Sequence, residues 1–179
     1  MLATAGLWGV EFKESPILLT PRGEMPMKPI RRILVPTDFG ECSAPALRLA
    51  AFLAEQLHAE LILLHVVQDV ALALPDAVMP TSVPAPDLAE MIESGKEGLA
   101  NLIRSEHLEH LHPQMEIRVG SPVAEIVAAA KDLHADLLCI GTHGRTGLAH
   151  LILGSQAERI LREAPCPVLT VKPSSAAAD

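Results

Sequence analysis

The stretch that most constrains the fold of this chain is a buried-strand pattern that leads into a glycine-rich loop and a helix start. Residues Asp136–Ile140 are apolar after the first position, which is typical of a strand buried on both faces of a parallel sheet. The following segment, Gly141–Ser155, is rich in glycine. A helix is predicted to begin at Ser155, because Ser155–Glu158 has the form of a capping box. The residues predicted to face inward from this helix are Ala157, Ile160, Leu161 and Ala164.

This arrangement suits phosphate binding. Glycine lets a backbone approach a ligand closely, and free N–H groups at a helix start favour an anion by about 0.3–1 kcal/mol. The hydroxyl of Ser155 can donate to a phosphate oxygen as well. One glycine loop is a weak signal, and an ordinary strand-to-helix turn would show the same residues. The chain contains neither the Walker loop nor the Gly-x-Gly-x-x-Gly fingerprint, which disfavours a Walker ATPase and a standard dinucleotide-binding dehydrogenase.

Two motifs, far apart in the chain, carry a resemblance to a known family. Gly141, Gly144 and the pair Gly154-Ser155 follow the spacing Gly-x2-Gly-x9-Gly-Ser/Thr, and Arg32–Asp38 reads Arg-Ile-Leu-Val-Pro-Thr-Asp. Together they resemble the ATP-binding branch of the universal stress protein family. The resemblance covers nearly all of residues 30–173 and places one domain there, after an irregular extension at 1–29 and before a flexible tail at 174–179.

The order of the predicted elements indicates the fold class. Strands are predicted at 33–35, 61–67, 115–119, 136–140 and 168–171, and helices at about 43–57, 87–108, from 122 onward, and from 155 onward. Segment 68–86 is a long loop that is either a lid or disordered. Five strands alternating with four helices predict a Rossmann-like α/β fold, an open, doubly wound parallel sheet with helices on both faces. The resemblance implies strand order 3-2-1-4-5, with the ligand at the carboxyl ends of strands 1 and 4.

The resemblance also implies a set of nucleotide-binding residues. Pro36, Thr37 and Asp38 would border the nucleoside, with Asp38 near the ribose or a phosphate-bound divalent ion, although Asp38 also suits a simple turn. Val66 and Ile140 would flank the adenine. The ribose and phosphates would meet Gly141, His143, Gly144, Arg145, Gly154, Ser155 and the N–H of Gln156. The implied ligand is ATP, AMP or ADP, bound together with Mg²⁺.

Composition limits the other classes of function. A formal net charge of −8 argues against a nucleic-acid surface, and no apolar run is long enough to cross a membrane. The chain has three cysteines, an odd number without metal-ligand spacing, which favours reduced thiols in the cytoplasm. His107, His110 and His112 are interpreted as solvated residues at a helix end, so no metal site is predicted.

Three functions are compatible with these features. The first is an ATP-binding regulatory factor of the stress-response type, with a protein partner that the sequence does not identify. The second is a slow ATP hydrolase, for which Asp38, His143 and Arg145 are candidates without forming a recognisable catalytic set. The third is an adaptor that binds no nucleotide. Because residues 168–171 would form an exposed apolar edge strand, and relatives pair this strand with its copy, a homodimer is also predicted.

Overall fold

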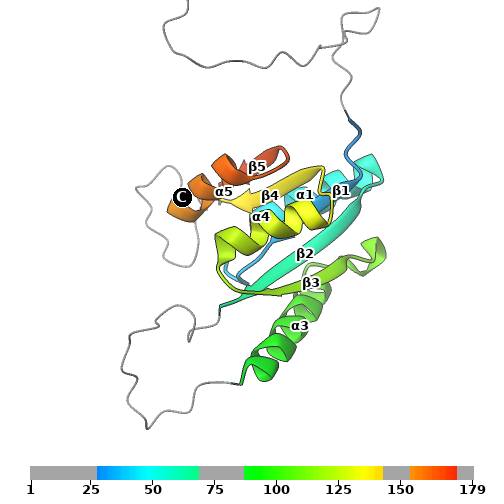
Figure 1. Ribbon diagram of the computed structural model, residues 1–179. Coiled ribbons are helices and arrows are strands. Elements are labelled where there is room, and N and C mark those ends of the chain that lie inside the picture. The colour runs from blue at the N-terminus through cyan, green and yellow to red at the C-terminus, as the bar shows by residue number, and fades with distance from the viewer. Residues whose placement is uncertain (1–27, 69–86, 143–153, 173–179) are drawn as a thin grey trace, which may run out of the picture.

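The computed structural model describes residues 28–68, 87–142 and 154–172, and these residues form one sheet covered by helices (Figure 1). Its five parallel strands are β1 (Arg32–Pro36), β2 (Glu60–Val67), β3 (Gln114–Val119), β4 (Leu137–Gly141) and β5 (Val168–Val171). They lie side by side in the order β3-β2-β1-β4-β5. The predicted fold class and strand order are therefore confirmed. The loop at 68–86, apart from Gln68, and the tail at 174–179 lie outside the described residues.

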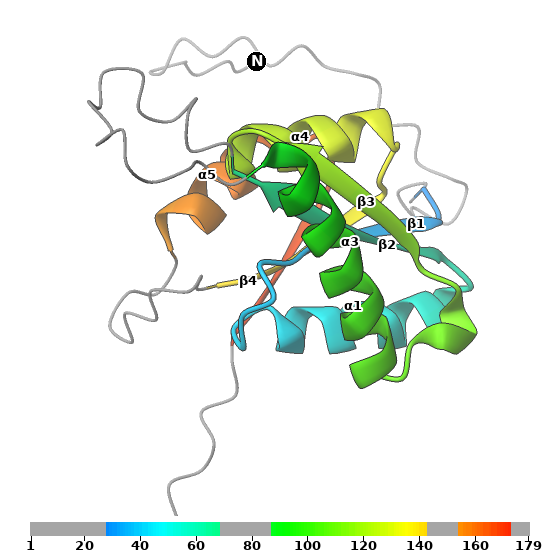
Figure 2. The same cartoon turned by 90° about the horizontal axis from the view of Figure 1, so that it is seen from below.

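Helices cover both faces of the sheet. They are α1 (Ala44–Leu57), α3 (Leu88–Ser105), α4 (Pro122–Asp132) and α5 (Ser155–Glu163), with a short 3₁₀ helix, η1 (Glu109–Leu111), before β3. In Figure 2 α1 lies on one side of the sheet, and α4 and α5 lie on the other. The helix α3 packs against β2 and β3 on the α1 side.

Each face of the sheet has its own hydrophobic core, because alternate strand residues point to opposite faces. The α1 and α3 side buries Ile33, Val35, Leu61 and Leu63 against helix residues that include Leu47 and Leu99. The α4 and α5 side buries Leu34, Ile62, Leu64 and Leu138 against Val123, Ile126 and Ile160. The three central strands are apolar on successive residues because both of their faces are covered, as the sequence pattern indicates.

Some helix details differ from the predictions. The second predicted helix, α3, ends at Ser105 and not near Leu108. Leu161 of α5 is 48% exposed, so the inner face of that helix consists of its neighbours Ala157 and Ile160, with Ala164 packed at its end.

Candidate functional site

A cleft of about 1060 Å³ opens at the carboxyl ends of β1, β2 and β4. This volume lies at the upper limit of the range of about 300–1,000 Å³ that is usual for small-molecule sites. The cleft lies where the order of the strands reverses: β1 has β2 on one side and β4 on the other. Ligands of open α/β sheets bind at such a reversal, because the loops from the two sides diverge there. The site is therefore a property of the topology before any side chain is considered.

The start of α5 forms one wall of this cleft. Gly154 has extended backbone angles and is the residue before the helix; its N–H donates to the carbonyl of Thr142 at 2.9 Å. The first bond within the helix runs from the N–H of Glu158 to the carbonyl of Gly154 at 2.9 Å. The N–H groups of residues 155–157 therefore have no carbonyl within the helix to bond. They are the free donors at the positive end of the helix dipole.

The predicted capping box at Ser155 is wrong. Ser155 is the first residue of the helix, the cap position belongs to Gly154, and no side chain caps the helix. The register shifts by one residue because Gly154 adopts the extended conformation that ends the loop. At α1 the N-cap residue is Ser43, but its hydroxyl donates to the carbonyl of Gly40 at 2.8 Å and makes no capping hydrogen bond to the helix.

The loop between β1 and α1 forms the opposite wall and is held by its own side chains. The Thr37 hydroxyl accepts the N–H of Phe39 at 3.0 Å, and Asp38 Oδ1 accepts the N–H of Gly40 at 2.9 Å. The hydroxyls of Thr37 and Ser43 are 3.1 Å apart. Since the Ser43 proton is directed at Gly40, Thr37 is the donor in this pair. The turn chemistry predicted for Asp38 is thus present, and the turn lies at the rim of the cleft.

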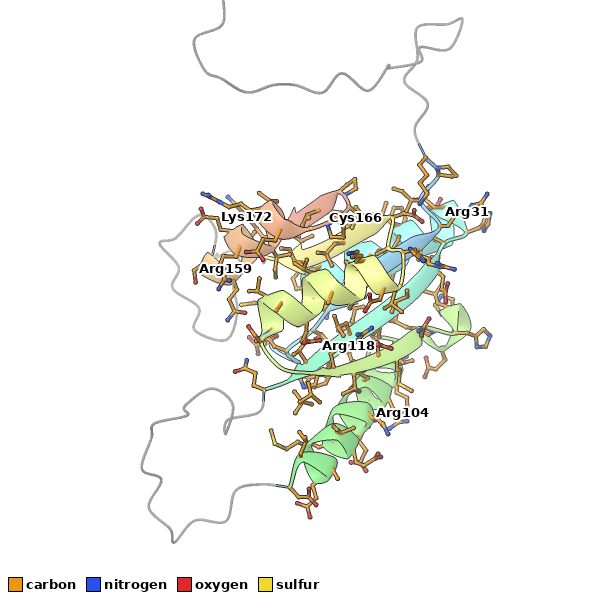
Figure 3. All side chains as sticks on the ribbon, viewed as in Figure 1. Arg31, Arg104, Arg118, Arg159, Cys166 and Lys172 are labelled. Carbon is orange, nitrogen blue, oxygen red and sulfur yellow. The ribbon has the colours of Figure 1, made fainter. Side chains whose placement is uncertain are left out.

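The electrostatics of the cleft come from the backbone. Among its described lining residues the charged side chains are Asp38 and Glu90, and there is no lysine or arginine. Arg31, Arg104 and Arg118 lie in other parts of the ribbon (Figure 3). Beneath the cleft, burial raises the pKa of the Cys139 thiol to about 12, so that thiol stays protonated and unreactive. An anion in this cleft would meet N–H groups and not a cluster of cations.

The structure brings most of the predicted site residues together. Nine of them line the cleft: Pro36, Thr37, Asp38, Val66, Ile140, Gly141, Gly154, Ser155 and Gln156. His143, Gly144 and Arg145 lie outside the described residues. The described part of the chain contains no group of three or more potential metal ligands, and His107, His110 and His112 are exposed.

Several lining residues were missed by the sequence reasoning. Phe39 and His65 line the cleft together with the α3 residues Glu90, Met91, Ser94, Gly95 and Gly98. The one signal available was His65 itself, a polar residue within the apolar run of β2. The α3 residues gave no signal, because a helix distant in sequence reaches the cleft only through the packing of α3 on β2 and β3.

Two buried polar side chains also line the cleft. Thr37 and Thr142 are the buried polar side chains among the described residues, with exposures of 7% and 3%. They follow β1 and β4, the two neighbouring strands at the topological reversal. Together, the fold and the cleft define an open α/β protein with a ligand site at the reversal of strand order. No helix within the described ranges has the length and apolar character needed to cross a membrane.

Comparison with known proteins assigns this α/β protein to a family. The sequence model described as the universal stress protein family matches residues 29–172. The chain is 35% identical over 143 residues to Universal stress protein MJ0531 of Methanocaldococcus jannaschii, which covers 79% of this chain and 82% of that protein. The chain belongs to the universal stress protein family.

Solved structures agree with this assignment. The structure of MJ0577, from the same archaeon, has a TM-score of 0.65 at 30% identity, covering 81% of this chain and 97% of that one. A universal stress protein in complex with cAMP has a TM-score of 0.56 at 24% identity, covering 82% and 100%. The second likeness is evidence for the shared fold alone.

Proposed function

We propose that this protein binds an adenine nucleotide, ATP or its products ADP and AMP, in the cleft between β1 and β4. The observation that carries the proposal is the convergence of two separate motifs. The Thr37-Asp38 turn and the free N–H groups at the start of α5 border one cleft whose described lining contains no lysine or arginine. Those N–H groups can bind phosphate without a cationic side chain. The relative solved with cAMP belongs to the same fold and holds an adenine nucleotide.

Each part of the nucleotide has a matching surface in this proposal. Val66, Ile140 and Asp38 all line the cleft; the first two would offer apolar side chains to the base, and Asp38 would bind the ribose or a metal ion. Gly141, Gly154, Ser155 and Gln156 surround the phosphates, with Gly144 and Arg145 of the same motif completing the set outside the described residues. His143 stays a prediction from the motif.

Asp38 fits a Mg²⁺ ion that arrives with the nucleotide. The described residues offer no larger set of carboxylates or histidines at this position. Mg²⁺ is commonly held by one or two carboxylates together with phosphate oxygens and several waters. One aspartate beside a phosphate site satisfies that requirement. The ion would neutralise phosphate charge in a protein whose net charge is −8.

The biological role that we propose is regulatory: nucleotide binding would alter the partners or the shape of a stress-response factor. A homodimer through β5 belongs to the same proposal, since β5 is an edge strand with four half-buried residues. The domain limits at 30–173, the cytoplasmic location and an additional protein partner stay predictions from the sequence.

Thermal unfolding with ATP and Mg²⁺ tests the proposal. A ligand at 100 times its Kd stabilises the native state by about 2.7 kcal/mol. For a domain of this size each kcal/mol raises Tm by roughly 2–4 °C, so we expect a rise of about 5–10 °C. Sodium tripolyphosphate is the control for charge alone, and added EDTA reports the contribution of Mg²⁺. An unchanged Tm at saturating ATP would contradict nucleotide binding and leave the adaptor hypothesis.

A further inference from the structure

We infer that His65 is a positioning residue, which holds the loop between β1 and α1 (residues 37–43) in the shape that the nucleotide cleft requires. This inference rests on the proposed function. His65 lies in β2, a strand whose other residues from Leu61 to Val67 are apolar. A polar ring in such a position is costly unless it is hydrogen-bonded. The contacts of the ring therefore indicate what it is for.

The ring has one hydrogen bond in the described part of the chain. Its Nδ1 lies 2.9 Å from the carbonyl oxygen of Thr37. A carbonyl only accepts, so Nδ1 carries the proton and donates it. Thr37 is buried, with 7% of its surface exposed. Its carbonyl would lose its imidazole donor if His65 were replaced by a residue that cannot donate.

The ring also packs against the loop on its other side. The centroids of the His65 and Phe39 rings are 4.3 Å apart, with the planes tilted by 31°. Phe39 has a φ of 62°, a left-handed conformation that is uncommon for a bulky side chain and needs support from its surroundings. The imidazole supplies that support, since it contacts the loop at both Thr37 and Phe39.

The helix α3 is shaped to admit this pair of rings. A Cβ atom at Gly95 would lie 3.1 Å from Cδ2 of His65, and one at Gly98 would lie 2.7 Å from Cζ of Phe39. Glycine weakens a helix interior relative to alanine. Both glycines line the cleft where the rings pass. The two rings therefore fill a slot between α3 and the end of the sheet.

This slot connects the ring to the ligand site through Asp38. Asp38 lies between the two residues that His65 contacts, and its carboxylate accepts the N–H of Gly40 within the same turn. A shift of Thr37 or Phe39 would move Asp38 relative to the start of α5. His65 thus acts on the nucleotide through the loop and is a positioning residue, not a catalytic one.

Two substitutions separate the hydrogen bond from the ring. His65→Phe keeps an aromatic ring and removes the donor, whereas His65→Asn places an amide N–H close to the position of Nδ1 and removes the ring. His65→Gln moves the amide away from Thr37. It is the second variant without the donor, to be used if His65→Phe does not fold. His110→Phe is the matched control, because His110 is an exposed residue within η1, at the opposite end of the sheet.

Two readouts are measured on the full chain, with Tm as the check on global folding. Hydrogen exchange of residues 37–43 without nucleotide should be about tenfold faster in His65→Phe, less than threefold faster in His65→Asn, which keeps the donor and loses the ring, and unchanged in His110→Phe. The Kd for ATP with Mg²⁺ should rise by about tenfold in His65→Phe and by less than threefold in His65→Asn. A residue that is merely structural would change exchange throughout the sheet and would not be rescued by asparagine.

The outcomes are distinguishable from those of the proposed function. Wild-type protein that does not bind ATP refutes the proposed nucleotide function, and with it the role of His65 in nucleotide binding, even if the exchange data show that His65 orders the loop. Unchanged loop exchange in a folded His65→Phe or His65→Gln protein overturns the positioning role. Equal loosening by His65→Asn and His65→Phe also overturns it, because the hydrogen bond would then not be the cause.

Discussion

Most of the described non-glycine residues with a left-handed backbone conformation are histidines that end helices. Apart from Phe39, the described non-glycine residues with positive φ are His58, His107, His112 and His134. His58 and His112 are the C-cap residues of α1 and η1, and His58 donates its N–H back into the last turn of α1. Histidine is among the residues that tolerate this conformation best after glycine. The histidine-rich segment is therefore explained by chain reversal, in keeping with its interpretation as a solvated helix end.

His110 is not among these residues with positive φ, and its hydrogen bond supports a prediction about pH. Its Nε2 lies 2.5 Å from Oε1 of Glu55 at the end of α1, and this hydrogen bond raises the pKa of His110 despite partial desolvation. A histidine whose pKa is raised in the folded state stabilises that state at pH values below its unfolded pKa of about 6.5. This stabilisation is lost as the pH rises through the folded-state pKa. We expect Glu55→Gln to lower the free energy of unfolding more at pH 6 than at pH 9.

Urea denaturation of both proteins at the two pH values measures this difference. An NMR titration should show a lower pKa for His110 in the Glu55→Gln protein. The neighbouring charges on the same side, His107 and Glu109, are unchanged in the comparison. A stability gap that widens toward pH 9 would contradict the assignment.

Gly154 supports a second prediction at this scale. It lines the cleft beside the free N–H groups of α5, so a branched side chain there would occupy space close to the proposed phosphates. We expect Gly154→Val to weaken ATP binding at least tenfold, about 1.4 kcal/mol, in isothermal titration calorimetry. Ala124→Val adds the same two methyl groups on an exposed part of α4 and should leave the affinity unchanged. Equal affinity in Gly154→Val would place the phosphates elsewhere.

Among the elements, the pairing of β1 with β4 depends on one carboxylate. Asp136 accepts the N–H groups of Arg31 and Arg32 at 3.0 and 3.1 Å, and its other oxygen pairs with Lys28 at 2.5 Å. The side chain of Asp136 is 7% exposed. The hydrogen bond from Lys28, aided by the two backbone donors, lowers the pKa of Asp136. The start of β1 is thereby held to the start of β4, below the site.

Asp136→Asn should cost about 1–3 kcal/mol of unfolding free energy at pH 7, because the donors from Lys28, Arg31 and Arg32 lose a charged acceptor. An aspartate whose pKa is lowered in the folded state stabilises that state at pH values above its unfolded pKa of about 3.9. This stabilisation is lost as the pH falls through the folded-state pKa. The difference from wild type should therefore shrink toward pH 2 in denaturation experiments. Asp132→Asn is the control, since Asp132 is 55% exposed in its pair with Arg118 and such pairs contribute about 0–1 kcal/mol. A cost that is independent of pH would contradict the role of the carboxylate charge.

For the whole molecule, the proposed dimer makes a prediction about β5. The carbonyls of Pro167 and Val171 accept from Leu138 and Thr142 on the β4 side. Because backbone groups of alternate residues point to opposite sides of a strand, the N–H of Thr170 faces away from β4. Thr170→Pro removes an outward donor that a second copy of β5 would use, without breaking the β4 ladder.

Sedimentation equilibrium should give a dimer mass for the wild type and for Thr170→Val, which keeps the donor, and a monomer mass for Thr170→Pro. A monomeric wild-type protein would refute the dimer. Circular dichroism of the proline variant is the check that the sheet has survived.

The sequence by itself determined the class of fold and nine of the residues that line the cleft. Local patterns are sufficient for this: continuous apolar runs predict strands covered on both faces, and the order of strands and helices permits few topologies. The glycine spacing and the Val-Pro-Thr-Asp opening identified both walls of the cleft, since one wall directly follows β1 and the other begins where the glycine motif ends, at the start of α5.

The tertiary structure decided which partners those segments meet. Helix ends shifted by a few residues, and Leu161 proved exposed, because the part of an apolar stripe that meets the sheet is not encoded in the periodicity of the helix. The contact of His65 with Thr37 and Phe39, and the slot that Gly95 and Gly98 open in α3, join segments 26 to 59 residues apart. Such contacts depend on how elements pack across the sheet, which no local pattern specifies.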